Sequence, residues 1–204
     1  MRRKYIGSVL WILCLQYFIV QVIVANAYVG EFSWTQNTIS DLGNTACSVY
    51  SNRYVCSPQH LIMNISFILL GILQLTGALF LYLANKNRSN QVGYGCLVLA
   101  GIGTIIVGLY PENAVGPMHA FGAALPFVLG NIAMIILAAN SRFPAWLKYY
   151  SYFSGIAALM ALVLFMTQNY LGIGLGGMER VVAYPQTVWM IIVGVYYLLR
   201  GQRL

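Results

Sequence analysis

Six long apolar stretches decide what this chain can fold into. Each is close to the roughly 20 residues that a helix needs to cross the hydrocarbon core of a bilayer. Hydrophobic residues make up 60% of the chain and charged residues only 7%, against about 25% charged in soluble domains. The sequence therefore predicts an all-α fold: one transmembrane domain over residues 1–204, with helices at about 6–28, 59–84, 92–110, 118–139, 149–168 and 184–199.

The basic residues predict the orientation of these helices. Nine of the eleven lysines and arginines fall at the two ends of the chain and in the second and fourth connections, which six spans place on one side. Because cytoplasmic loops are enriched in Lys and Arg, we expect this side and both termini to be cytoplasmic, in the plasma membrane of a prokaryote. The nine residues are Arg2, Arg3, Lys4, Lys86, Arg88, Arg142, Lys148, Arg200 and Arg203.

This charge distribution also excludes some functions. The net charge of +7 describes a basic inner rim next to the lipid bilayer, and no soluble basic domain exists to bind nucleic acid. Ion channels and proton-coupled transporters more often carry an ionisable residue near the middle of a span. The predicted spans have none there, which argues against both classes.

The N-terminus permits a second interpretation. MRRK, the apolar run and Ala25-Asn26-Ala27 resemble a signal peptide with an A-x-A cleavage site. The run is longer than the usual apolar region of about 7–15 residues, which favours an uncleaved first helix. Cleavage would leave five spans and the same outer surface.

The outer side carries the polar connections. The first, about residues 29–58, includes WTQNTISDLGNTAC (34–47), a mixture of turn formers and ligand-type side chains. Its Cys47 and Cys56 predict a disulfide in a compartment that permits one, worth about 2–3 kcal/mol. The connection at 168–184 has four glycines in six positions, which either makes it flexible or lets its backbone approach another group closely.

The two histidines occupy matching positions. His60 in SPQH and His119 in GPMH each follow a proline by two residues, and Thr187 does the same in YPQT. Proline is favoured at the first position of a helix, so these residues are predicted in the first turns of three helices. The partial positive charge of a helix N-terminus favours the neutral imidazole, which binds metals or accepts a proton.

The role of these outer polar groups stays open between three interpretations. In a metal-dependent hydrolase, His60 and His119 would hold one divalent ion such as zinc together with Asp41 or Glu112, and Glu179 would act as general base. In a binding protein, the same pocket would take a small, anionic or lipid-like ligand. A structural or sensory protein would use the groups without catalysis. The expected catalytic residues are Asp41 and Glu179, and the expected ligand contacts are Ser40, Asn64, Glu112, Arg180 and Thr187.

Four segments of the chain resemble a known family. Together they are similar to DUF998, a bacterial and archaeal family of small six-helix membrane proteins of unknown function. The resemblance covers most of the chain and implies one shared outer site, but it implies no activity. The segments are TISDLG (38–43), PQHLIMNISFILLG (58–71), VGLYPENAVGPMHAFGAALPFVLGNIAMI (107–135) and GGMERVVAYPQTVW (176–189), and the implied site is Ser40, Asp41, His60, Glu112, His119, Glu179 and Arg180.

A more distant likeness is to membrane hydrolases that gather aspartate, serine and histidines at one end of a helix bundle. The chain lacks their final HxxxH motif and their seventh helix. Zinc hydrolysis is therefore not implied by this second likeness.

Overall fold

The structure is an antiparallel bundle of membrane-spanning helices. The computed structural model describes residues 2–201, and within them six helical spans are long and apolar enough to cross a bilayer, which confirms the predicted fold class. Arg203 lies outside the described residues. The spans are α1 (Arg2–Leu13) with α2 (Gln16–Asn26), α3 (His60–Ala84), α4 (Arg88–Leu109), α5 (Gly116–Leu125) with η2 (Pro126–Gly130) and α6 (Asn131–Asn140), α7 (Ala145–Met166) and α8 (Gly174–Gly201).

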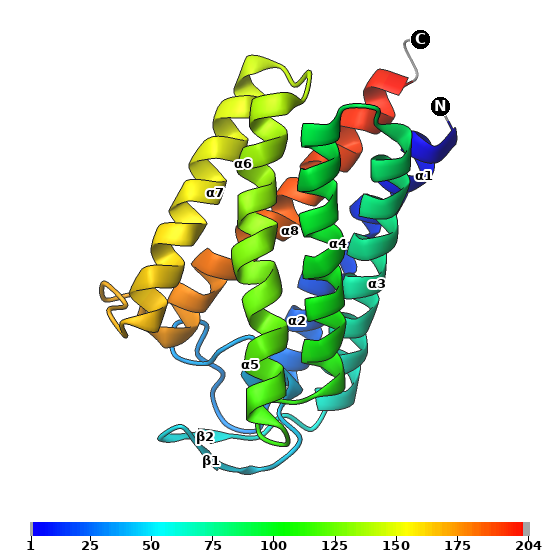
Figure 1. The fold of residues 1–204 in the computed structure, drawn as a ribbon. Helices are drawn as coiled ribbons and strands as arrows, with labels where there is room; N and C mark the ends of the chain where they lie inside the picture. Colours follow the sequence, from blue (N-terminus) through cyan, green and yellow to red (C-terminus); the bar gives the residue numbers. More distant parts are fainter. Residues whose placement is uncertain (1, 202–204) are drawn as a thin grey trace.

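The two ends of the bundle differ. Figure 1 shows α1 beginning and α8 ending at one end, which we call the terminal end. The opposite end is covered by residues 29–59, which we call the cap; it contains a short 3-10 helix η1 (Ser40–Gly43) and the hairpin of β1 (Ser48–Tyr50) and β2 (Arg53–Val55). The longest stretch of polar, irregular backbone therefore lies at one end of the bundle, away from the hydrocarbon core.

The outward faces of the spans are apolar and exposed. Large side chains such as Ile19, Leu69, Leu99 and Phe153 are 41–75% exposed along these faces. In a soluble protein such a surface would be an aggregation liability. Here it is the surface that contacts lipid.

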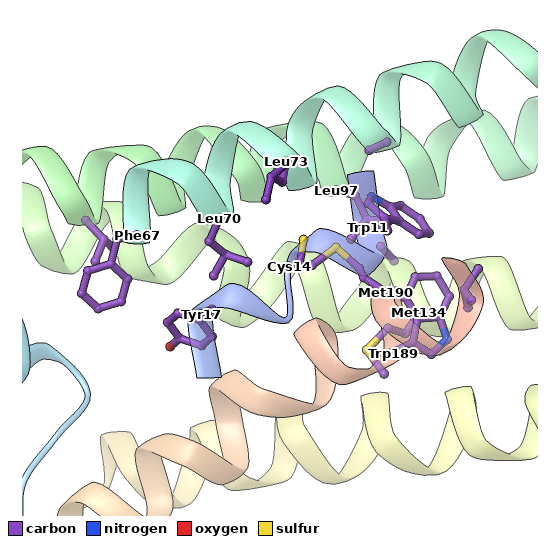
Figure 2. Packing of buried hydrophobic residues seen from close by; sticks show 14 of the residues in the cluster. Trp11, Cys14, Tyr17, Phe67, Leu70, Leu73, Leu97, Met134, Trp189 and Met190 are labelled. Carbon is purple, nitrogen blue, oxygen red and sulfur yellow. The ribbon is translucent and has the colours of Figure 1, made fainter. Parts of the chain in front are cut away.

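Two tryptophans occupy the centre of the bundle. Figure 2 shows Trp11 and Trp189 close together among buried apolar side chains, and their ring centroids are 5.7 Å apart. Trp11 Nε1 donates to the Gln74 carbonyl oxygen at 3.3 Å, and Trp189 Nε1 donates to Ser151 Oγ at 2.7 Å. Both indole N–H groups are thus satisfied where no water is available, as buried tryptophans require.

The first span is interrupted, whereas the sequence predicted one continuous helix over 6–28. Cys14 and Leu15 separate α1 from α2, and their amides bond to carbonyls three residues back. Gln16 then reaches α3, where its side chain exchanges hydrogen bonds with the Ser66 carbonyl at 3.2 Å and the Ser66 hydroxyl at 2.8 Å. The interruption is therefore stabilised by a polar contact with a neighbouring helix.

Glycines bring α3 and α4 into backbone contact. A Cβ atom built on Gly71 would lie 2.6 Å from the Gly101 carbonyl oxygen, and one built on Gly101 would lie 2.8 Å from the Gly71 carbonyl oxygen. Small residues at such crossings let membrane helices pack closely. These two helices form the wall against which the candidate site is built.

We expect Gly101→Val to destabilise the protein by about 1–3 kcal/mol, because the new side chain would overlap the backbone of α3. Gly95→Val is the matched control: it lies in the same helix, and a Cβ there meets no atom within 4 Å. Thermal unfolding in detergent measures both. Equal losses in the two variants would contradict the role given to the α3–α4 contact.

Candidate functional site

The predicted disulfide closes the base of the cap hairpin. Cys47 and Cys56 are bonded, with their Cα atoms 4.1 Å apart, which confirms the pairing. The two cysteines directly flank β1 and β2. The hairpin itself was not predicted, since its strands are only three residues long.

Asp41 holds the cap together. Its buried carboxylate accepts hydrogen bonds from the Thr38 amide at 2.9 Å and from Asn37 Nδ2 at 3.1 Å, and it forms an ion pair with Arg53 at 2.6 Å. Burial alone would raise the pKa of Asp41, but the hydrogen bonds and charge of Arg53 hold it below its ordinary value. The structure therefore gives Asp41, which was predicted to be catalytic, a set of partners within the cap.

Glu112 joins the connection between α4 and α5 to the cap. Its carboxylate accepts a hydrogen bond from Asn44 Nδ2 at 3.2 Å, and its carbonyl accepts one from the Tyr50 hydroxyl at 3.2 Å. Burial, followed by the negative charge of Asp41, raises the pKa of Glu112 to about 8. Near neutral pH this side chain is therefore mostly protonated.

The glycine-rich segment forms the first turns of α8. This helix begins at Gly174, well before the start predicted at 184, and Pro185 lies inside it rather than at its first position. A Cβ on Gly176 would collide with the Asn37 carbonyl, and the Gly177 amide donates to the Thr35 carbonyl at 3.0 Å. Of the two predicted uses of these glycines, the structure has the close backbone approach.

Arg180 binds the cap to α8. Its Nη1 donates to three carbonyl oxygens, of Trp34 at 3.0 Å, Asn37 at 2.7 Å and Gly176 at 2.8 Å. Its guanidinium also lies over the Trp34 ring, 5.0 Å from the centroid. Arg180 thus fixes the path of the chain that leads to Ser40.

Ser40 and His119 form a hydrogen-bonded pair. His119 Nδ1 lies 2.9 Å from the Tyr110 carbonyl oxygen, which can only accept, so Nδ1 carries the proton. In the neutral imidazole, Nε2 then accepts from the Ser40 hydroxyl at 2.8 Å. Glu179 lies on the other side: its Oε1 is 3.4 Å from Ser40 Oγ, and its Oε2 accepts from the amide of Ile39. This is the geometry of a serine whose proton has an acceptor in place.

His60 lies apart from this pair. Its Nδ1 is 2.9 Å from the Ser57 carbonyl oxygen, at the start of α3. Within residues 2–201, no three His, Cys, Asp or Glu side chains are grouped closely enough to hold a metal ion. The structure therefore does not bring His60 and His119 together with a carboxylate. Asn64, one turn below His60, donates to the Gly43 carbonyl at 2.9 Å and so positions the end of η1.

Beneath Ser40 lies a cavity that we call the cap pocket. It leaves about 50 Å³ for the centres of water-sized molecules, several times the roughly 10–15 Å³ that one water needs. Six polar residues line it, and the rest of the wall is apolar or aromatic. The polar ones are Ser40, Gln74, Thr104, Glu179, Gln186 and Thr187. The apolar lining side chains come from α2, α3, α4, α5, η2 and α8, with Ile39 from the cap: Tyr17, Ile39, Phe67, Leu70, Val107, Ala123, Pro126, Phe127 and Ala183.

Sequence reasoning named part of this site and missed the rest. Ser40, Glu179 and Thr187 do line the cap pocket, whereas Asn64, Glu112 and Arg180 bond to the cap backbone or its side chains. The carbonyl of Tyr110 and the amide of Ile39 leave no sequence signal. Arg53 did leave one, because it is the only basic residue in the same connection as Asp41.

Comparison with known proteins identifies the family of this chain. Residues 12–196 match the family described as "Protein of unknown function (DUF998)". The chain belongs to the DUF998 family. No curated protein and no solved structure gives a match.

We expect the protein to lose stability as pH rises from about 5 to about 9. The folded-state pKa of Glu112, about 8, lies above its ordinary value of 4.5. Its contribution to the unfolding free energy is therefore complete below about pH 4.5, falls as pH rises from there, and is lost once pH exceeds 8. Glu112→Gln stays neutral and should show a smaller loss. Asp41, whose pKa is lowered, changes charge below this window.

Thermal unfolding of both proteins across that range measures the difference. The variant should match the wild type near pH 5 and exceed it near pH 9. A wild-type midpoint that stays above that of the variant at pH 9 would show that Glu112 is not kept neutral by the fold.

Proposed function

We propose that the cap pocket binds a small or lipid-like molecule, with its polar group at Ser40, Glu179 and Thr187. The observation that carries the proposal is the lining: a largely apolar cavity with a small number of polar groups in its wall is the usual form of a small-molecule site. The apolar wall would hold an alkyl portion of the ligand. If the predicted orientation holds, Ser40 and Glu179 would lie toward the outer leaflet.

A distortion of the helix wall beside the pocket supports the proposal. Pro126 and Phe127 both line the cavity, and they belong to η2, a π-helical segment within the fourth span. Such segments occur often at functional sites. Regular packing at this point would have continued the α-helix.

A photoreactive monoacylglycerol tests binding. After irradiation of the detergent-purified protein, we expect crosslinks at pocket residues such as Phe67 and Phe127. Ala183→Phe fills the cavity and should reduce labelling by about tenfold, with Ala123→Leu as a second filling variant. Leu99→Phe, which enlarges a lipid-facing side chain of α4, is the control. Labelling confined to lipid-facing residues, or unchanged by both filling variants, would rule the proposal out.

The Ser40–His119 pair favours a second candidate function, hydrolysis of an ester. Ser40 Oγ would attack the carbonyl carbon while its proton passes to His119 Nε2, and the same proton would then leave with the alcohol. In the second step, His119 Nε2 would take a proton from water, the water oxygen would attack the acyl carbon, and the proton would return to Ser40 Oγ as the acid leaves. The Tyr110 carbonyl, which fixes the tautomer of His119, would take the orienting role that an aspartate has in serine proteases.

The positions of the side chains favour hydrolysis by a serine nucleophile over hydrolysis by a metal-activated water. A metal-activated water would need His60, His119 and a carboxylate around one point, and these side chains have separate partners. Ser40 needs no such rearrangement. If Ser40 and His119 have only a structural role, substituting His119 should lower the stability of the protein without slowing the reaction of Ser40 with a probe.

A fluorophosphonate probe distinguishes these roles. We expect the probe to label Ser40 in the wild-type protein and to leave the Ser40→Ala variant unlabelled. The His119→Gln variant should react about 100-fold more slowly, because the general base is lost. Ser48→Ala, an exposed serine of the same cap, is the control. A reaction rate unaffected by His119→Gln would exclude an activated serine, and it would leave the binding proposal standing.

A further inference from the structure

A second, larger cavity lies at the terminal end of the bundle. It has a volume of about 840 Å³, and four cationic side chains from four separate segments line it. We call it the basic pocket. The cations are Lys4 of α1, Lys86 of the α3–α4 connection, Arg142 of the α6–α7 connection and Arg200 of α8.

No acidic residue balances these charges. The four acids of the chain, at positions 31, 41, 112 and 179, all belong to the cap or to the segments beneath it. Within residues 2–201, the ion pair that the structure contains is Asp41–Arg53, at the far end of the bundle. The mutual repulsion of the four cations is therefore reduced only by solvent or by a bound anion.

Four asparagines line the basic pocket, and the NH₂ group of one of them, Asn140, donates to the Ile136 carbonyl at 2.8 Å. The other three use their side-chain oxygens. Asn85 Oδ1 accepts from the Asn87 amide at 3.0 Å, Asn87 Oδ1 accepts from the Ser89 amide at 2.9 Å, and Asn90 Oδ1 accepts from the Ser141 hydroxyl at 3.2 Å. Because backbone amides can only donate, the side-chain orientation of Asn85 and Asn87 is fixed. The amide oxygens of Asn85, Asn87 and Asn90 are engaged in the fold, so the NH₂ groups of these three residues remain as donors.

Two of the cations are held in place by aromatic residues. Lys4 Nζ lies 3.9 Å from the centroid of the Tyr197 ring, and Arg200 Nη1 donates to the Tyr196 hydroxyl at 2.6 Å. Arg200 Nη1 also donates to the Arg142 carbonyl at 3.3 Å. Charges that are held around a hollow bind an anion at a smaller entropic cost than mobile surface lysines do.

We propose that the basic pocket binds a phosphate-bearing anion. Phosphate oxygens accept several charge-assisted hydrogen bonds at once, from both Lys and Arg, which matches a wall of cations and amide donors. The volume exceeds what one phosphate fills and admits a diphosphate or a glycerol phosphate. The anion comes either from a lipid headgroup of the leaflet at this end or from a soluble phosphate compound. This proposal is independent of the function proposed for the cap pocket.

Basic residues near the pocket supply a matched control. Arg88 and Lys148 lie at the same end of the bundle but do not line the cavity. The double variant Lys86→Gln/Arg142→Gln and the double variant Arg88→Gln/Lys148→Gln therefore remove the same charge, one pair from the pocket and the other from beside it. Lys86 and Arg142 are exposed, so folding should survive, and the thermal midpoint of each variant checks this.

Two probes separate the two sources. Calorimetric titration of the detergent-purified protein with pyrophosphate tests a soluble anion. Native mass spectrometry after reconstitution in phosphatidylcholine nanodiscs with and without phosphatidic acid tests a lipid headgroup. Binding should weaken about tenfold or more for each pocket cation removed, and it should be unchanged in the Arg88/Lys148 variant.

The outcomes decide the proposal. Pyrophosphate binding lost only in the pocket variant would support a soluble phosphate ligand. Retention of phosphatidic acid lost only in the pocket variant, without pyrophosphate binding, would support a lipid headgroup. Equal weakening in both double variants would show general attraction to a basic surface and overturn the proposal. The proposal would also be overturned if the wild-type protein bound neither pyrophosphate nor phosphatidic acid.

Discussion

The hydrocarbon core of a bilayer offers no water to a peptide group, so each backbone N–H and C=O there needs a partner within the protein. The six spans meet this constraint as helices, and at the break in the first span the Cys14 and Leu15 amides still bond to carbonyls three residues back. The break at Cys14–Leu15 is held by the Gln16–Ser66 contact, and η2 faces the cap pocket. Each irregular point in these spans thus has a neighbouring helix or the cap pocket beside it.

The site at the cap end depends on contacts between segments far apart in the sequence. Arg180 holds the cap backbone through the carbonyls of Trp34 and Asn37, and Glu179 accepts from the amide directly before Ser40. His119 approaches Ser40 from α5. The pair is therefore positioned from two sides by groups that line the pocket or lie behind it, which is the support that a reactive geometry needs.

Hydropathy was enough to predict the bundle, because spans in lipid have few alternatives, and cysteine spacing was enough for the disulfide. The site was less predictable. His60 and His119 have the same local sequence pattern, and only the path of the cap decides that Ser40 meets His119. Asp41 was expected to be catalytic, yet its ion pair with Arg53 depends on a hairpin too short to recognise. The start of α8 was misplaced, because glycines and Pro185 usually mark a loop or a helix start, and here the glycines make room for the cap backbone.

Arg180 and Glu179 lie on the last helix of the chain, while the segment they organise lies between the first two spans. During synthesis, Ser40 is therefore made long before the residues that fix its position. Until α8 inserts and packs against the bundle, the cap lacks Arg180, which binds its carbonyl oxygens, and Glu179, which accepts from the Ile39 amide. A chain that still lacks α8 therefore has neither Glu179 beside Ser40 nor the wall that Ala183 and Thr187 give to the cavity.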